Sequence, residues 1–267
     1  MSELTPRQRR ERELHDAWAR ELKPDELLVE ESFSAPTAPE NRFIRARFGD
    51  VSGKRLLDLG AGAGEASLWF ARRGARVSAL DISAGQLEVL SEAARADGLE
   101  IETHAGEAEQ LPWPDATFDL VYGNGVLHHV DIERTIAEVR RVLRPGGQVA
   151  FIEPLPYNPA IWIYRRLAEG VRTPDERPLS ARQVRWVASQ LGGGHREFWI
   201  SALALFGWFY LGERVSPSVD RYWKKVIRDG ARYERMVRPL FALDAVLSRV
   251  PGVRMLAWNT VIFGSRG

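Results

Sequence analysis

The chain has 267 residues, 45% of them hydrophobic, with no cysteine and a formal net charge of +1 from 37 basic and 36 acidic side chains. This length and apolar content suffice for one large globular unit with a buried core. The lack of cysteine excludes disulfides, thiolate metal sites and cysteine nucleophiles, and we expect no metal site. The balanced charge disfavours nucleic acid as a partner.

The first fifty residues are expected to form a helix and a linker. Thr5 is typical of a helix N-cap, with Pro6 at the first helical position and Gln8 completing a capping box, and the helix should reach about Leu22. Residues 33–39 contain two prolines and are expected to link this helix to a core that begins near residue 53. The N-terminal region lacks the apolar run of a signal peptide, so we expect a cytoplasmic protein.

From residue 55 onward, strand-like and helical patterns alternate. Strands are predicted at 55–59, 76–80, 100–104, 118–122 and 148–152, and helices at 65–73, 83–98 and 131–143. A helix at 180–191, a strand at 197–200 and a last strand at 259–263 follow. The alternation predicts an α/β fold, a doubly wound, Rossmann-like and mostly parallel sheet with helices on both faces.

Four parts are expected along the chain. They are an N-terminal helix and linker (1–50), the Rossmann-like core (51–200), an aromatic helical insertion (201–254) and the last strand of the core (255–267). The insertion is also basic, with Arg214, Arg221, Lys224, Lys225 and Arg228 around its aromatic side chains. Such a segment is suited to cap an apolar acceptor or to form an oligomer contact. Its basic flanks also leave a membrane-surface contact open.

The sequence LLDLGAGAG at 56–64 indicates a ligand site, because alternating glycines after a strand let a nucleotide-like ligand lie against the backbone. Its G-x-G-x-G spacing differs from the dinucleotide fingerprint, and Glu65 stands where the third glycine of that fingerprint would be. A carboxylate there would repel a pyrophosphate, which weakens an NAD-dependent oxidoreductase as an interpretation. Asp58 favours a ligand with an ammonium group, and Asp81 is placed to accept ribose hydroxyls.

Four blocks occur in order: LLDLGAGAGE, ALDIS, GEAEQLPWPDATFDLVYGNGVLHHV and VLRPGGQVAFIEP. Over about residues 54–153 the sequence resembles a class I S-adenosylmethionine-dependent methyltransferase of the small-molecule, type 11 or UbiE-like kind. The resemblance implies S-adenosylmethionine as cofactor and a leading helix that closes over it as a lid. The cofactor-binding residues that it implies are Asp58, Gly60, Ala61, Gly62, Asp81, Ile82, Glu107, Ala108 and Asn124. The family often has Asp at position 107 and a larger residue at position 61.

Two residues are catalytic candidates. His129 follows the fourth predicted strand, at the sheet edge where open α/β sheets bind ligands, and in the family the second histidine of such a pair is closer to the cofactor. Its alternative role is capping or packing. Glu153 ends the fifth predicted strand and could bind an acceptor or a cation-like transition state, or could instead orient the loop that begins at Pro154 through hydrogen bonds. His15, on the first helix, is expected to be structural, as are His104 and His195.

The resemblance and the aromatic insertion together predict methyl transfer to a small, hydrophobic or amphiphilic acceptor, on oxygen or carbon. A general base is optional for such a displacement. The alternative is a non-catalytic S-adenosylmethionine-binding module that uses its insertion to engage a protein or a membrane. The acceptor, the methylated atom and the oligomeric state stay open.

Overall fold

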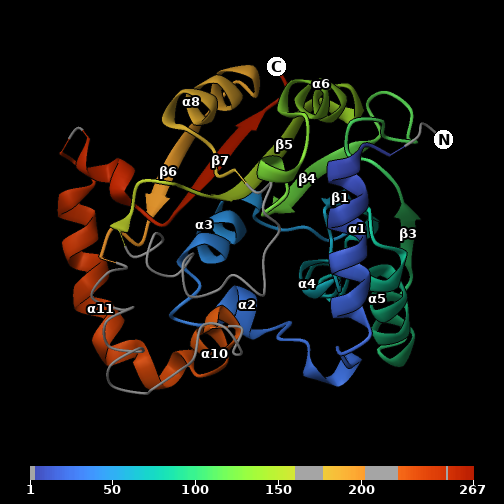
Figure 1. Cartoon of the computed structure of the whole chain (residues 1–267), viewed down its shortest axis with the longest axis horizontal. Helices are drawn as coiled ribbons and strands as arrows, with labels where there is room; N and C mark the ends of the chain where they lie inside the picture. The colour runs from blue at the N-terminus through green and yellow to red at the C-terminus, as the bar shows by residue number, and fades with distance from the viewer. Residues whose placement is uncertain (1–3, 160–176, 202–221, 251) are drawn as a thin grey trace.

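The core of the protein is a seven-stranded sheet, seen here in a computed structural model that describes residues 4–159, 177–201, 222–250 and 252–267 (Figure 1). The strand order is β3-β2-β1-β4-β5-β7-β6. All neighbouring strands are parallel except β7, which runs antiparallel to β5 and to β6. The predicted mostly parallel α/β sheet is therefore confirmed. The strands are β1 (Arg55–Leu59), β2 (Arg76–Asp81), β3 (Ile101–Ala105), β4 (Phe118–Asn124), β5 (Leu143–Pro154), β6 (Gly194–Phe198) and β7 (Asn259–Ser265).

Each face of the sheet has its own hydrophobic core, because successive residues of a strand point to opposite faces. Leu56 of β1 packs in a core with α2, α3, α4 and α5, whereas its neighbour Leu57 packs with α6 and α8. Figure 1 shows α6 and α8 above the sheet and α3, α4 and α5 below it. These helices are α2 (Glu31–Ser34), α3 (Pro39–Phe48), α4 (Glu65–Ala71), α5 (Ala84–Ala96), α6 (Ile132–Val142) and α8 (Ala181–Gln190).

The N-terminal region differs from the predicted helix and linker. Helix α1 (Pro6–Ala19) has the predicted capping box between Thr5 and Gln8, but it ends before Leu22 and is followed by the short 3₁₀-helix η1 (Pro24–Glu26). The prediction of a linker at residues 33–39 is wrong, because Phe33 lies in α2 with no exposed surface and stacks on Trp69. Helix α3 follows at once, so the buried core begins about twenty residues before the predicted start near residue 53.

Strand β6 lies about three residues before the predicted 197–200. It ends at Phe198, because Trp199 has a positive φ of 66° that no strand residue adopts. The Trp199 ring is buried against Phe241, so tertiary packing determines where the strand stops.

The described part of the predicted insertion contains α10 (Tyr222–Arg228), α11 (Gly230–Leu247) and the 3₁₀-helix η5 (Val253–Leu256). Residues 202–221 of that insertion, including Arg214 and Arg221, lie outside the described residues. Helix α10 packs on α2, and Thr37 Oγ1 donates a hydrogen bond of 2.8 Å to the carbonyl of Val226. In the described ranges, no helix is both long enough and apolar enough to cross a bilayer.

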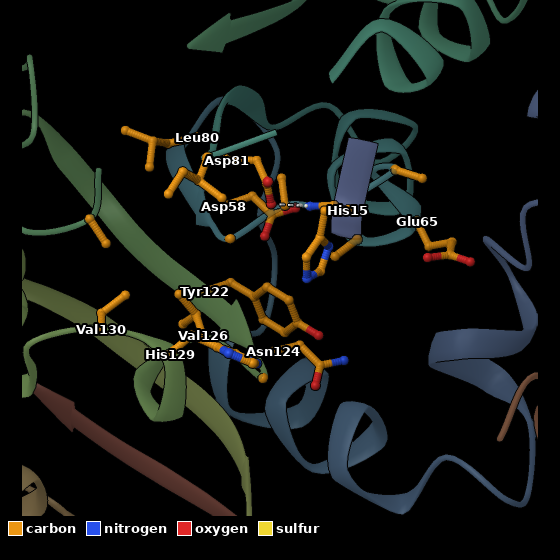
Figure 2. Close-up of a pocket in the computed structure, with 18 of the residues that line it drawn as sticks. His15, Asp58, Glu65, Leu80, Asp81, Tyr122, Asn124, Val126, His129 and Val130 are labelled. Carbon is orange, nitrogen blue, oxygen red and sulfur yellow. Dashed lines mark hydrogen bonds between the residues drawn. The ribbon is translucent and has the colours of Figure 1, made fainter. Parts of the chain in front are cut away.

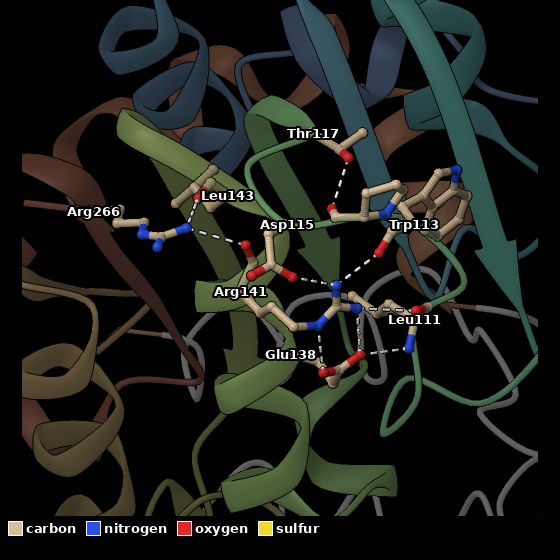
Figure 3. Close-up of polar contacts among 9 residues, drawn as sticks. Leu111, Trp113, Asp115, Thr117, Glu138, Arg141, Leu143 and Arg266 are labelled. Carbon is tan, nitrogen blue, oxygen red and sulfur yellow. Dashed lines mark hydrogen bonds and ion pairs between the residues drawn. The ribbon is translucent and has the colours of Figure 1, made fainter.

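Arg141, near the end of α6, holds the connection between β3 and β4 (Figure 3). Its guanidinium donates to the backbone carbonyls of Leu111 (3.0 Å) and Trp113 (2.8 Å) and to the carboxylates of Glu138 and Asp115. These hydrogen bonds from Arg141 lower the pKa of the Glu138 carboxyl below its ordinary value. Glu138 also accepts the backbone N–H of Leu111 at 2.8 Å. The Arg141–Glu138 ion pair therefore binds both the N–H and the carbonyl of Leu111.

Replacing this arginine should destabilise the fold measurably. We expect Arg141→Ala to lower the free energy of unfolding by about 2 to 4 kcal/mol, because several charge-assisted hydrogen bonds are lost at once. Arg134→Ala on the same helix is the control, since that side chain is 77% exposed and its ion-pair partner Asp131 is exposed as well. Urea unfolding of both variants measures the difference, and equal effects would contradict this role of Arg141.

Candidate functional site

A cavity of about 300 Å³ lies at the carboxyl ends of β1, β2 and β4, where open α/β sheets place their ligands. Figure 2 shows the carboxyl groups of Asp58 and Asp81 together on one side and Tyr122 and Asn124 on the other. The cavity brings together Asp58, Gly60, Ala61, Gly62, Asp81, Ile82, Glu107, Ala108, Asn124 and His129, all of them candidates from the sequence.

The glycine loop between β1 and α4 forms one wall, and its shape depends on the missing side chains. Gly64 has a φ of 89°, and a Cβ there would come within 2.2 Å of the Leu90 side chain, so this position lets α4 pack closely on α5. Gly62 has a φ of 54° and would meet no atom within 4 Å. Because Gly62 lines the cavity, a side chain there would occupy space that a ligand can use.

Asp81, at the end of β2, holds this loop in place. Its Oδ2 accepts the backbone N–H of Gly62 at 2.8 Å, and its Oδ1 accepts that of Ser83 at 2.9 Å. The residue is only 6% exposed, yet it lines the cavity. Each carboxylate oxygen has a second lone pair, so both retain an acceptor position for ligand hydroxyls.

Asp58 is buried beneath the loop, with 1% of its surface exposed. Burial, with a contribution from the nearby Asp81 carboxylate, raises the pKa of Asp58 to about 7, although the Ser67 hydroxyl donates to it at 2.6 Å. A cationic ligand group close to Asp58 would offset both effects and favour the ionised carboxylate.

Another part of the cavity wall is formed by helix α1 and the residues that follow β3, which contact each other. Gln8 Nε2 donates to Glu107 Oε2 at 3.0 Å, while Gln8 Oε1 accepts the backbone N–H of Thr5 in the capping box. The capping box therefore orients the amide so that its NH₂ group faces Glu107. Gln8 thus completes the capping box of α1 and also ties this helix to the cavity wall.

The two catalytic candidates have different surroundings. Glu153 has no exposed surface, and its Oε1 accepts the backbone N–H groups of Val126 (3.0 Å) and Leu127 (2.7 Å), while its Oε2 lies 2.7 Å from His128 Nδ1. Glu153 is absent from the described residues that line the cavity. Its carboxylate instead fixes the loop after β4, whose 3₁₀-helix η2 (Leu127–His129) turns His129 into the cavity wall.

Several lining residues were not predicted. His15 was expected to be structural, but it lines the cavity, as do Gln8 and Glu11 of the same helix. These positions are three to four residues apart and share one face of α1, so the only signal in the sequence was their helical spacing on a highly charged helix. Tyr122 also lines the cavity and donates to Asn41 Oδ1 at 2.8 Å.

The cavity is strongly acidic. Among the described residues that line it, none is Lys or Arg, and the carboxylates are those of Glu11, Asp58, Glu65, Asp81, Glu107 and Glu109. Such a wall repels phosphates and attracts cations. These acceptors therefore fit a ligand that carries positive charge and ribose hydroxyls, as S-adenosylmethionine does, and disfavour a dinucleotide.

Comparison with known proteins agrees with this chemistry. Residues 57–151, which contain the glycine loop, Asp81 and His129, match the family described as a methyltransferase domain. These residues form a class I, S-adenosylmethionine-dependent methyltransferase domain. The prediction of this family from the four sequence blocks is confirmed, and S-adenosylmethionine is the cofactor of the domain.

Relatives of the methyltransferase domain act on different molecules. The chain is 43% identical to demethylmenaquinone methyltransferase of Thermobifida fusca over 114 residues, which cover 40% of this chain and 48% of that protein. It is 30% identical to phthiotriol/phenolphthiotriol dimycocerosates methyltransferase of Mycobacterium tuberculosis over 178 residues, which cover 64% of this chain and 65% of that protein. The chain thus spans between about half and two thirds of the length of these curated relatives.

The structural similarity to a solved protein extends beyond residues 57–151. Geranyl diphosphate methyltransferase, whose structure was solved in complex with SAM, aligns with a TM-score of 0.57 at 19% identity. The alignment covers 86% of this chain and 85% of that one, so the two proteins share a fold.

The buried Asp58 makes stability depend on pH. Between its ordinary pKa of 3.8 and about 7, the folded state holds a proton on this carboxyl that the unfolded state has lost, so this contribution to stability falls as pH rises. Asp58→Asn should lack this pH dependence. We expect the free energy of unfolding of the variant, relative to that of the wild type, to rise by about 3 to 4 kcal/mol from pH 3.8 to pH 7.

Urea unfolding of both proteins at a series of pH values, without cofactor, measures this difference. The neutral amide that replaces the carboxyl in the variant does not titrate, so the difference between the two curves isolates Asp58. A difference that stays constant from pH 4 to pH 7, or that changes in the opposite direction, would contradict the buried state of this carboxyl.

Proposed function

We propose that this chain transfers a methyl group from S-adenosylmethionine to oxygen or carbon of a small, neutral, hydrophobic or amphiphilic acceptor. The observation that carries the proposal is the acidic cavity, where the glycine loop, Asp81 and His129 line one space at the carboxyl edge of the sheet. The wall suits a cationic cofactor, and the histidine offers a proton acceptor beside it.

The residues of the cavity have separate tasks in this proposal. Asp81 would hold the ribose hydroxyls, with Ile82 against the adenine ring and Glu107 and Ala108 at the adenine amino edge. Gly60, Ala61, Gly62 and Asn124 would contact the methionine part through their backbone, and the ammonium group would lie on the side of Asp58. The open space beside Gly62 and the two oxygens of Asp81 support this arrangement.

When bound, S-adenosylmethionine would supply an electrophilic methyl group on a sulfonium, with the thioether of S-adenosylhomocysteine as the in-line leaving group. The protein contributes alignment, worth roughly 7 to 11 kcal/mol in the best cases. His129 accepts the proton that the acceptor oxygen or carbon loses as its new bond to the methyl carbon forms. A base in this position typically adds about 10² to 10⁴ in rate.

Glu153 acts indirectly in this proposal. Its buried carboxylate already binds two backbone N–H groups and His128, so it shapes the loop that carries His129 and does not contact the acceptor. Its sequence-based assignment as a catalytic group is therefore replaced by a positioning role.

The acceptor class follows from the remaining wall. Phe33, Val126, Val130 and Ile227 give the cavity an apolar side, and Ile227 comes from α10 of the insertion. The carboxylates disfavour an anionic group near the reacting centre. A neutral phenol, hydroquinone or aliphatic alcohol with an apolar body satisfies both conditions, and two relatives are named for menaquinone-type and lipid-type molecules.

The division of the chain into lid, core and cap belongs to the same proposal. The hydrogen bond from Gln8 to Glu107 supports α1 as a lid, and Ile227 supports the insertion as a cap. Helix α11 exposes Leu243 and Val246 next to exposed arginines, which supports the membrane-surface contact that the sequence left open.

Calorimetry with S-adenosylhomocysteine tests the cofactor site. We expect wild-type protein to bind it and Asp81→Ala to weaken binding about 100-fold or more, because hydrogen bonds to a charged group are lost. Asp97→Ala is the matched control, since Asp97 pairs with Arg72 on the surface away from the cavity. Circular dichroism verifies that both variants fold.

Incubation with methyl-labelled S-adenosylmethionine and a panel of hydroquinones, phenols and aliphatic alcohols then tests the reaction. Mass spectrometry should detect one added methyl group on a member of the panel. Binding of NAD without binding of S-adenosylhomocysteine would overturn the proposed cofactor. Binding without transfer to any acceptor would favour the non-catalytic module instead.

A further inference from the structure

Helix α1 buries an acidic side chain where a surface helix ordinarily buries an apolar one. Glu11 is only 5% exposed, and in the described part of this helix Ala19 is the other buried residue. Burying a carboxylate costs several kcal/mol unless partners compensate for its lost hydration. A buried acid that lines the cavity of an enzyme therefore calls for a functional explanation.

The partners of Glu11 are histidines that line the same cavity. Its Oε1 lies 3.0 Å from His129 Nδ1, and its Oε2 lies 3.7 Å from His15 Nε2. The rings of His15 and His129 approach edge to face, with centroids 6.5 Å apart. His129 Nδ1 is buried and makes no hydrogen bond of ordinary geometry with the described residues, and the Glu11 carboxylate oxygen, 3.0 Å away, is an acceptor within its reach.

The two adjacent histidines are thereby assigned to different carboxylates. His128 faces inward, with its Nδ1 2.7 Å from Glu153, while His129 faces the cavity beside Glu11. The docking of α1 onto this loop is fixed one turn earlier, where Arg7 Nη2 donates to the carbonyl of His128 at 2.6 Å. Positions 7 and 11 are four residues apart and lie on the same face of α1, so the contact of Arg7 with the loop also positions Glu11 beside His129.

From this geometry we propose that Glu11 is the positioning residue of His129, so that α1 completes the proton-accepting part of the site. The carboxylate holds the proton of the neutral imidazole on Nδ1, which leaves the lone pair on Nε2 to accept the proton of the methyl acceptor. After that transfer, Glu11 stabilises the imidazolium by charge. The inference rests on the proposed function for its chemistry, but the orientation of the imidazole is a property of the protein alone.

The tautomer of His129 tests this directly. Long-range ¹H–¹⁵N NMR of ¹⁵N-histidine-labelled full-length protein distinguishes the Nδ1–H form from the Nε2–H form, and His129→Gln assigns the signal by its loss. We expect the neutral imidazole of wild-type His129 to be mainly in the Nδ1–H form. Glu11→Met keeps the volume without an acceptor and should lose this preference, whereas Glu11→Gln keeps an acceptor oxygen and should retain it.

Transfer kinetics separate the charge of Glu11 from its hydrogen bond. We expect the methyl transfer rate to fall about 10- to 100-fold in Glu11→Met and by less in Glu11→Gln, because Gln still orients the ring. The affinity for S-adenosylhomocysteine should stay within about threefold of wild type. Glu13→Gln, at an exposed position of the same helix, should change neither the tautomer nor the rate.

An unchanged His129 tautomer in Glu11→Met would overturn the inference, and so would a rate loss explained entirely by weaker cofactor binding. The proposed function can fail separately. If wild-type protein methylates no acceptor, the proposed reaction is wrong, yet the tautomer experiment still decides whether Glu11 positions His129, because it needs neither cofactor nor acceptor.

Discussion

The site depends on one constraint: backbone N–H groups of the loops at the carboxyl edge of the sheet must find acceptors once they are buried. In both loops that build the cavity, the acceptor is a carboxylate at the end of the neighbouring strand. Asp81 of β2 binds Gly62 in the loop after β1, and Glu153 of β5 binds Val126 and Leu127 in the loop after β4. The parallel order of these strands is what brings each carboxylate beside its loop.

Because these acceptors are carboxylates, the carboxyl edge of the sheet carries negative charge, which favours a cationic ligand. With Asp58 buried beside Asp81, a dinucleotide would bring phosphates against negative charge, whereas a sulfonium with an ammonium group would relieve it. Helix α1 adds Glu11 to the same wall. Asp81 therefore belongs both to the structural acceptors and to the cavity wall, since it accepts the backbone N–H groups of its loop and also lines the cavity.

The sequence predicts those features of the structure that a local backbone pattern determines. The glycine spacing and the position of Asp81 after a strand predicted the loop and its edge, because both follow from parallel-strand geometry. The prolines near Phe33 suggested a linker, but its burial against Trp69 depends on distant segments. The roles of Glu11 and Glu153 could not be predicted for the same reason, since only the folded chain determines which partner a buried carboxylate meets.

We propose that this acidic edge holds S-adenosylmethionine in one orientation, with its reactive end toward His129. A crystal structure of the protein with S-adenosylhomocysteine tests it most directly. We expect the ribose hydroxyls on Asp81, the adenine beside Ile82 and Glu107, and the sulfur facing the side of the cavity that carries His129. A nucleoside bound outside this cavity, or one with its ribose away from Asp81, would contradict it.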